Sequence, residues 1–176
     1  MKFEQICPSQ WNQVKEIYME AFPKAERKPF FLLKRSKKVQ LFTATVGDNI
    51  LGFVAAIPLE NLVMVDYLAV NAKMRSNGTG SFLIQELCKA YKGQKVVLLI
   101  EQLDAAAENQ QQRIARRSFY LKNGFTSSHL QVNGVSGTME IMNFWGKVSS
   151  EEYLKLQKYA LGSLLFQLSK MKLVTE

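Results

Sequence analysis

The chain has 176 residues, of which 47% are hydrophobic and 22% charged, a composition typical of a soluble globular protein of one domain. It has no apolar run near the ~20 residues of a membrane span and no secretory pattern at its start, so we expect a cytoplasmic protein without a membrane partner. The formal net charge is +8, and many basic residues fall between positions 24 and 38. Because no aromatic-basic interleaving accompanies this cluster, a solvated charged face explains it better than a nucleic-acid partner.

The first third of the chain reads as a strand followed by two helices. In order, we expect a strand at residues 2–7, a helix at 11–22, a charged loop between two prolines at 23–29 and a short helix at 30–37. Pro8 would end the strand, and Ser9 would be the N-cap of the first helix.

Three strands come next. Alternating or apolar runs predict them at residues 40–46, 50–58 and 62–70, with turn residues at 47–49 and 59–61. Connections this short make the three strands an antiparallel meander. The third is apolar apart from Asp66, which suits a strand that is covered on both faces.

A cationic glycine turn follows this strand. It reads Arg75-Ser-Asn-Gly-Thr-Gly80, and residues 81–91 then show the apolar spacing of a helix. Two glycines let the backbone approach a ligand closely, and the start of a helix attracts an anion, so the turn predicts a site for a phosphate-bearing ligand. It is neither a Walker A loop, because no lysine follows Gly80, nor a dinucleotide fingerprint, because Leu83 replaces the third glycine.

The second half of the chain adds strands and two helices. A strand at 95–101 would lie parallel to the strand at 62–70, because a right-handed helical crossover joins them. We further expect a helix at about 109–122 with Gly124 in its C-cap, strands at 125–132 and 138–145 around the hairpin pair Asn133-Gly134, and a helix at about 149–172 opened by a capping box. The fold class is α/β (α+β): a mixed, mostly antiparallel sheet of about six to seven strands with helices on both faces and an extra C-terminal helix.

Two motifs in this order resemble those of one family. Arg75-x-x-Gly78-x-Gly80, between a strand and a helix, resembles the acetyl-coenzyme A loop of the GNAT superfamily of N-acetyltransferases. Tyr120-x-x-x-Gly124-Phe125, at the end of a later helix, resembles a second element of that superfamily. The resemblance covers residues 1 to about 145. It implies the GNAT acyl-CoA N-acyltransferase fold in a single domain over residues 1–176, with its core at about 1–147.

The resemblance also implies which residues hold the ligands. The residues expected to bind the coenzyme are Leu68, Ala69, Val70, Arg75, Ser76, Asn77, Gly78, Thr79, Gly80, Ser81, Arg113 and Arg117. Backbone amides of Leu68 and Val70 would hold the pantetheine arm and polarise the thioester carbonyl. Many members have an asparagine where this chain has Arg113, so Arg113 or Arg117 would contact a phosphate instead. Glu26 and Arg27 lie in a loop that lines the acceptor site in the superfamily, which makes them candidate acceptor contacts.

The implied reaction moves an acetyl group from acetyl-CoA to a primary amine by direct attack through a tetrahedral intermediate. By resemblance, Tyr120 would protonate the departing thiolate, since a phenol with a pKa of about 10 holds its proton at neutral pH. Glu101, at the end of a strand, is the candidate general base and would relay a proton through water.

We expect no metal, because His129 has no acidic or Cys neighbours in sequence and Cys7 and Cys88 read as reduced structural thiols.

Two other functional classes stay open. One is a catalytically degenerate protein that binds acyl-CoA without turnover, and the other is a basic protein that binds nucleic acid. The expected partners are acetyl-CoA and an amine-bearing acceptor of unidentified structure, and the chain would act as a monomer or a homodimer.

Overall fold

A computed structural model describes residues 1–24, 26–75, 77–134, 137–169 and 171–175 of the chain. The chain forms two compact units. The N-terminal unit consists of Met1–Pro58 and Val65–Lys92, and the C-terminal unit consists of Leu59–Met64 and Gly93–Glu176. Strand β4 (Leu62–Val70) therefore contributes residues to both units.

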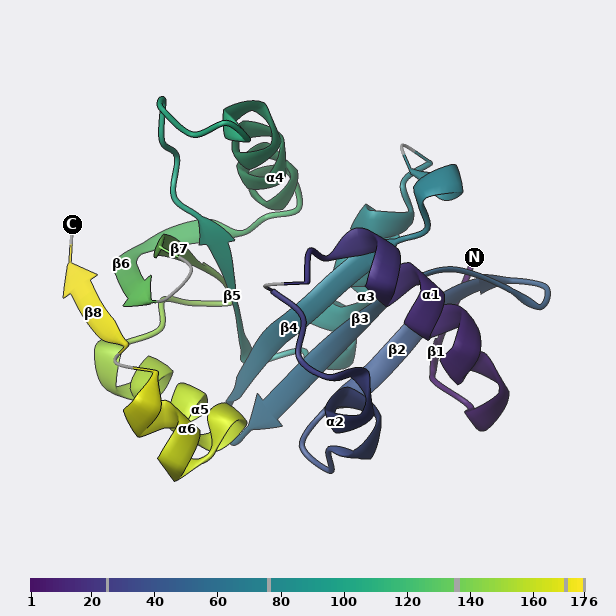
Figure 1. Cartoon of the computed structure of the whole chain (residues 1–176), viewed down its shortest axis with the longest axis horizontal. Coiled ribbons are helices and arrows are strands. Elements are labelled where there is room, and N and C mark those ends of the chain that lie inside the picture. The colour runs from purple at the N-terminus through teal and green to yellow at the C-terminus, as the bar shows by residue number, and fades with distance from the viewer. Residues whose placement is uncertain (25, 76, 135–136, 170, 176) are drawn as a thin grey trace. The chain divides into compact units, whose positions relative to one another are not determined.

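The described residues form one sheet in the strand order β1-β2-β3-β4-β5-β7-β6-β8 (Figure 1). Besides β4, its strands are β1 (Lys2–Gln5), β2 (Gln40–Val46), β3 (Asn49–Leu59), β5 (Lys95–Glu101), β6 (Thr126–Gly134), β7 (Gly137–Phe144) and β8 (Lys172–Thr175). Strands β4 and β5 pair in parallel, whereas β1–β2, β2–β3, β5–β7, β6–β7 and β6–β8 are antiparallel. The predicted mixed, mostly antiparallel sheet and its parallel pair are confirmed.

The N-terminal unit has helices on both faces of its strands. Its helices are the 3₁₀ turns η1 (Pro8–Gln10) and η2 (Ala72–Met74) and the α-helices α1 (Trp11–Ala21), α2 (Phe30–Arg35) and α3 (Thr79–Ala90). The ring of Tyr18 on α1 lies 6.4 Å from that of Phe53 on β3. A Cβ on the adjacent Gly52 would come within 3.1 Å of Leu83 on α3. Because successive strand residues point to opposite faces, α1 and α3 cover opposite sides.

The core of the N-terminal unit lies under α1 and α2. Val14, Ile17, Tyr18, Leu33 and Phe53 belong to it and are almost wholly buried. Val14, Ile17 and Tyr18 follow one another at spacings of three and one along α1, so they lie on one side of the helix. Tyr67 of β4 joins the same cluster, and its ring lies 5.0 Å from that of Tyr18. The core therefore fixes the strand that carries predicted coenzyme contacts.

The C-terminal unit contains the helices α4 (Gln110–Lys122), α5 (Ser150–Leu161) and α6 (Ser163–Leu168). Helix α4 ends in a Schellman motif, in which Phe125 N–H bonds to Tyr120 O at 3.1 Å and Gly124 N–H to Leu121 O at 3.0 Å. Gly124 takes φ +86° there, as its predicted C-cap role requires. Helix α5 begins with the predicted capping box, since Ser149 Oγ accepts from Glu152 N–H at 3.2 Å and Glu152 Oε2 accepts from Ser149 N–H at 2.8 Å.

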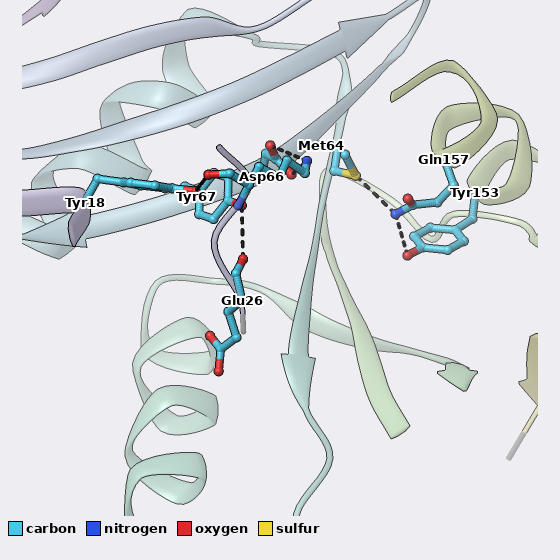
Figure 2. A network of polar contacts seen from close by, with 8 residues as sticks. Tyr18, Glu26, Met64, Asp66, Tyr67, Tyr153 and Gln157 are labelled. Carbon is cyan, nitrogen blue, oxygen red and sulfur yellow. Dashed lines mark hydrogen bonds and ion pairs between the residues drawn. The ribbon is translucent and has the colours of Figure 1, made fainter. Parts of the chain in front are cut away.

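Helix α5 packs through a small buried polar contact. Gln157 Nε2 donates to Tyr153 Oη at 2.7 Å and lies 3.2 Å from Met64 Sδ (Figure 2). Tyr153 is 1% exposed and Leu156 is fully buried. Helix α5 therefore packs against its own unit through Tyr153, Leu156 and Gln157.

The prediction of one helix over residues 149–172 is wrong. Gly162, at φ +80°, ends α5, and the chain then forms the short helix α6 and the strand β8. Strand β8 pairs with β6 from Leu130↔Thr175 to Asn133↔Lys172. This pairing raises the sheet to eight strands in the described chain, above the predicted six to seven.

Two smaller predictions are also wrong. Asn133 and Gly134 are not the hairpin turn, because they pair with Thr138 and Gly137 inside the β6–β7 ladder. Residues 135 and 136 lie outside the described residues. Ser9 is not an N-cap, because the 3₁₀ turn η1 precedes α1 and Ser9 Oγ lies 3.1 Å from Cys7 Sγ. No helix in the described part of the chain has the length and apolar character to cross a membrane.

Candidate functional site

Strand β4 carries the first predicted coenzyme contacts. Tyr67 and Ala69 are buried, whereas Asp66, Leu68 and Val70 are only partly buried. This alternation places the last three side chains on one face of the strand. Beyond the strand, Asn71 N–H bonds to Leu51 O at 2.8 Å, which ties the start of the glycine turn to β3.

Helix α3 begins inside the glycine turn, as predicted, although at Thr79 rather than at residue 81. Its N-cap residue is Gly78, with φ +77°, in the left-handed region that a glycine adopts without strain. The first bond of the helix joins Phe82 N–H to Gly78 O at 2.9 Å. The N–H groups of Thr79 and Gly80 therefore precede the helical ladder at the positive end of the helix dipole, where an anion is stabilised.

Around this helix start the predicted residues differ in exposure. Arg75 and Asn77 are exposed, Gly80 and Ser81 are half-buried, and Thr79 is 2% exposed. Ser76 lies outside the described residues. The exposed guanidinium of Arg75 can reach an anion in solvent, whereas the Thr79 side chain belongs to the interior.

The loop that contains Glu26 is tied to the core by two tyrosines. Tyr67 Oη donates to Glu26 O and accepts from Lys28 N–H, each at 3.2 Å, and Tyr18 Oη donates to Lys28 O at 3.0 Å (Figure 2). Burial raises the pKa of both phenols, so they stay neutral and able to donate. The backbone at residues 26–28 is thus fixed by side chains of α1 and β4.

Lys28 and Asp66 form an ion pair beside these tyrosines. Lys28 Nζ lies 2.8 Å from both carboxylate oxygens of Asp66, and the Asp66 side chain is only 12% exposed. Asp66 was absent from the predicted site, although it stood out as the polar exception in an apolar strand. That exception was the available signal, because a carboxylate in a buried strand needs a partner.

The two residues predicted to contact the acceptor, Glu26 and Arg27, differ in the contacts that their side chains already make. Glu26 is exposed, and Figure 2 shows its carboxylate directed away from Tyr67. The Arg27 guanidinium donates to the carbonyl of Met19 at 3.3 Å and lies 2.9 Å from its sulfur. Glu26 is therefore available to an acceptor, whereas Arg27 already serves to hold the loop on α1.

In the C-terminal unit, Glu101 is the centre of a polar cluster. It accepts from Asn109 Nδ2 at 2.8 Å, pairs with Arg113 at 3.5 Å, and pairs more closely with Arg116. Partial burial works to raise its pKa, but the Asn109 hydrogen bond and the two arginine charges outweigh burial, and the net pKa is lowered. A carboxylate with a lowered pKa is a weak proton acceptor.

The arginines predicted to contact phosphate make ion pairs in this unit. Arg113 also donates to Asn109 Oδ1 at 2.7 Å and to Gln102 O at 2.8 Å. Arg117 pairs with the buried carboxylate of Glu140, with Nε 2.9 Å and Nη2 3.3 Å from its two oxygens. Both arginines hold α4 against β5 and β7, and a phosphate would have to share them with these partners.

Tyr120 sits in the last turn of α4 with its ring buried. The ring lies 5.0 Å from Phe119 and 5.6 Å from Phe125 in edge-to-face contacts, and the residue is 8% exposed. Within the described chain its hydroxyl has no hydrogen-bond partner. Burial raises the pKa of Tyr120 to about 12, although the charge of Arg116 acts in the opposite direction.

The remaining candidates stay outside these clusters. Cys88 is buried, and burial raises its pKa to about 12, as befits a structural thiol. Cys7 is exposed, and His129 takes φ +62° at an irregularity of β6. The described residues contain no group of three or more His, Cys, Asp and Glu side chains placed to hold a metal ion.

The family of the chain comes from a comparison with models of protein families. Residues 37–127, just over half of the chain, match the model of the acetyltransferase (GNAT) domain. A comparison with curated protein sequences gave no match.

Among solved structures, a GNAT-family protein from Bacteroides thetaiotaomicron is similar at a TM-score of 0.72 and 21% identity, over 94% of this chain and 98% of that one. The ribosomal-protein-S18-alanine N-acetyltransferase from Escherichia coli is similar at a TM-score of 0.64 and 15% identity, over 85% and 96%. A Bacillus subtilis acetyltransferase in complex with CoA is similar at a TM-score of 0.64 and 14% identity, over 81% and 97%. At these identities the similarity establishes the shared fold.

Proposed function

Because the chain belongs to the GNAT acetyltransferase family and is therefore an acyltransferase, we propose that it transfers an acetyl group from acetyl-CoA to a primary amine by direct attack. The observation that carries the proposal is the glycine turn at the start of α3, where Gly78 adopts the left-handed conformation and the amides of Thr79 and Gly80 precede the first bond of the helical ladder, at the end of the helix that attracts an anion. Coenzyme A supplies that anion as its pyrophosphate. The Bacillus subtilis acetyltransferase of the same fold was solved in complex with CoA, which supports coenzyme A as the ligand.

Donor binding is proposed to use the residues in and before this turn. Amides of the turn, among them those of Thr79 and Gly80, would bind the pyrophosphate, and Arg75 would add one exposed charge. Backbone groups of Leu68, Ala69 and Val70 would hold the pantetheine arm. On α4, Arg113 or Arg117 is proposed to contact a phosphate of the coenzyme, which would share the guanidinium group with the carboxylate that it already binds.

Tyr120 is the proposed general acid. When the tetrahedral intermediate collapses, the carbon–sulfur bond breaks and the sulfur takes a proton. A phenol whose pKa is raised to about 12 keeps its proton at neutral pH. Its hydroxyl, without a partner in the described chain, can donate to a sulfur atom without first breaking another bond.

Glu101 is the proposed proton relay, acting through water. Its lowered pKa makes it a weak base, so its contribution would be to hold and orient a water while the proton passes to solvent. Glu101→Gln should therefore lower kcat and change the pH–rate profile. Unchanged kinetics would leave Glu101 with the structural task of binding Arg113 and Arg116.

The acceptor is proposed to approach the loop at residues 26–28. Glu26 offers an exposed carboxylate on a backbone fixed by Tyr18 and Tyr67, which suits an ammonium group. Arg27 would act indirectly, by holding the loop on α1. Glu26→Gln should mainly raise the acceptor's KM, with little effect on kcat.

The proposal is tested by calorimetry with acetyl-CoA and by coenzyme release against a panel of amines. The panel should include a peptide with N-terminal alanine, because the E. coli structural relative is named for that activity. A free amino acid, a small polyamine and a lysine peptide complete it. Donor binding without release for any amine would favour a protein that binds acyl-CoA without turnover, and absence of donor binding would refute both readings.

A further inference from the structure

The outward face of α2 combines exposed apolar and basic side chains. Phe31 is 57% and Leu32 49% exposed, whereas Leu33 is 3% exposed and belongs to the core of the N-terminal unit. Arg35 follows Phe31 by four residues and Leu32 by three, so these three side chains share one face of the helix. Since Leu33 already anchors α2, Phe31 and Leu32 are not needed to hold the helix in place.

Positive charge is concentrated around this face. Residues 24–38 contain seven Lys and Arg against the single acid Glu26, a net charge of +6 in a chain of net charge +8. Lys28 is neutralised by Asp66, and Lys34 Nζ lies 5.8 Å from the Trp11 ring centroid. In the part of the chain that the structure describes, Lys34, Arg35 and Lys37 form no ion pair.

From this arrangement we propose that the α2 face, consisting of Phe31, Leu32, Lys34, Arg35 and Lys37, docks on the surface of a lipid membrane with anionic headgroups. Phe31 and Leu32 would enter the boundary between headgroups and acyl chains, and the three cations would meet lipid phosphates. Such docking is peripheral and needs no membrane-spanning helix, so it revises the expectation of no membrane partner, which rested on the lack of a long apolar run in the sequence. It is independent of the acetyl-transfer proposal.

The mixture of side chains favours a bilayer over other polyanions. Duplex nucleic acid offers phosphates but no apolar layer for two neighbouring hydrophobic side chains on a convex helix face. An acidic peptide would need a groove, whereas a bilayer is soft and accommodates protruding side chains. Large apolar side chains next to a polybasic cluster are the two components that interfacial binding combines.

The test is co-sedimentation of the full chain with vesicles of phosphatidylcholine alone and of phosphatidylcholine mixed with phosphatidylglycerol. We expect binding to the mixed vesicles, loss of binding as salt is raised, and little binding to phosphatidylcholine. Phe31→Ser with Leu32→Ser, and separately Arg35→Glu with Lys37→Glu, should each weaken partitioning by about tenfold or more. All four side chains are exposed, so melting should change little.

Two matched control variants test whether loss of basic charge, or of exposed apolar side chains, elsewhere on the protein weakens vesicle binding equally. Lys147→Glu with Lys158→Glu makes the same change in net charge on exposed residues of the C-terminal unit. Leu164→Ser with Leu165→Ser removes two exposed leucines from α6. Both control variants should bind mixed vesicles like the parent.

Four results would overturn the proposal. Three of them are the absence of binding to mixed vesicles, equal binding to vesicles of phosphatidylcholine alone, and equal losses of vesicle binding in the control variants. The fourth is full binding by the Phe31→Ser, Leu32→Ser variant, which would show that vesicle binding is electrostatic adsorption alone. Duplex DNA and polyglutamate are assayed in parallel. Binding to either of them without binding to vesicles would likewise overturn the membrane assignment.

Discussion

At Tyr120 the environment strengthens the hold on a proton that a free phenol, with a pKa of about 10, already keeps at neutral pH. Its ring is enclosed by Phe119 and Phe125, and the Schellman motif at Gly124 holds the helix end that carries it. Desolvation disfavours the phenolate, which raises the pKa to about 12. The residue therefore combines a fixed position with a retained proton, which are the two requirements for a general acid.

Tyr120→Phe should lower kcat while it leaves folding and donor affinity nearly unchanged. Only the hydroxyl is removed, so the ring contacts with Phe119 and Phe125 persist. Loss of a general acid costs about 10²–10⁴-fold in rate, and we expect the lower half of that range because a thiolate leaves tolerably well without a proton. Steady-state kinetics, acetyl-CoA calorimetry and thermal melting are the measurements. A parent-like kcat would refute the assignment, unless burst kinetics showed that product release limits the parent.

Glu101→Gln should destabilise the protein at neutral pH but not at low pH. The folded pKa of Glu101 is lowered, so its ionised form stabilises the fold above the unfolded pKa of about 4.3, and this contribution is lost as the pH falls through the folded pKa. The difference in melting temperature between parent and variant should therefore be full near pH 7 and shrink below about pH 4.

The control for Glu101 is Glu16→Gln, at an exposed position of α1 in the N-terminal unit. Its melting difference from the parent should be small and should not vary with pH. A Glu101→Gln difference that stayed constant between neutral and acidic pH would show that ionisation of Glu101 does not contribute to the stability of the fold.

The local sequence was enough to predict the structural position of some candidate site residues, but not the partners of others. Gly78 and Gly124 take their conformations from turn and cap geometry over a few residues, and the sequence placed them correctly at a helix start and a helix end. The partners of Arg113, Arg117 and Asp66 come from segments far apart in sequence. Pairings such as Arg117 with Glu140 or Lys28 with Asp66 depend on the sheet register and on a loop crossing a strand, which no local pattern encodes.

Among the elements, α3 carries the proposed donor site at its start. The turn residue Gly78 needs a left-handed conformation, whereas Gly80 lies within the first helical turn and has no positive φ. The two glycines therefore respond differently to substitution. A side chain at Gly78 strains the backbone, and one at Gly80 tests the approach of a ligand.

Gly80→Val should abolish or strongly weaken acetyl-CoA binding with little change in melting. Valine is acceptable to the backbone of a first helical turn at a cost of below about 1 kcal/mol, but its branched side chain would stand where the pyrophosphate must approach the amides. The measurement is calorimetric affinity for acetyl-CoA. Ala90→Val, exposed at the other end of α3, is the matched control and should bind like the parent. Retained donor affinity in Gly80→Val would remove the glycine turn from the proposed site.

The sequence predicted the ends of helices and strands correctly where a strong local signal marked them and no long-range pairing acted against it. Strand β5 and the capping box of α5 lie where the sequence placed them, because β-branched content and the Ser149–Glu152 pair are local. In the hairpin, long-range pairing outweighed the preference of Asn133-Gly134 for a turn, since strand register is set by the buried face. Gly162 was a visible helix breaker, but the apolar spacing on either side of it resembled one continuous helix.

At the scale of the whole molecule, β8 is the strand that the periodicity of the sequence could not predict. A four-residue strand carries little pattern, and it forms because β6 offers an unpaired edge. Val132, 2% exposed, pairs with Leu173, and Gln131 pairs with Val174. The C-terminal segment therefore covers an edge that would otherwise present free backbone N–H and C=O groups.

A chain that ends after Ser169 should self-associate and melt at a lower temperature than a chain that ends after Thr175. The shorter chain loses β8 and leaves the β6 edge open to pairing with a second molecule, whereas the longer one keeps every described residue of β8. The lost ladder is worth about 1–3 kcal/mol, since each net hydrogen bond contributes about 1 kcal/mol and the segment is short.

Light scattering over a range of concentrations and thermal melting provide the readouts. Donor binding should persist, because the glycine turn and β4 residues 68–70 belong to the N-terminal unit. If the shorter chain showed the same mass and melting temperature as the longer one, β8 would have no stabilising role, and the edge of β6 would have to be protected by its own side chains.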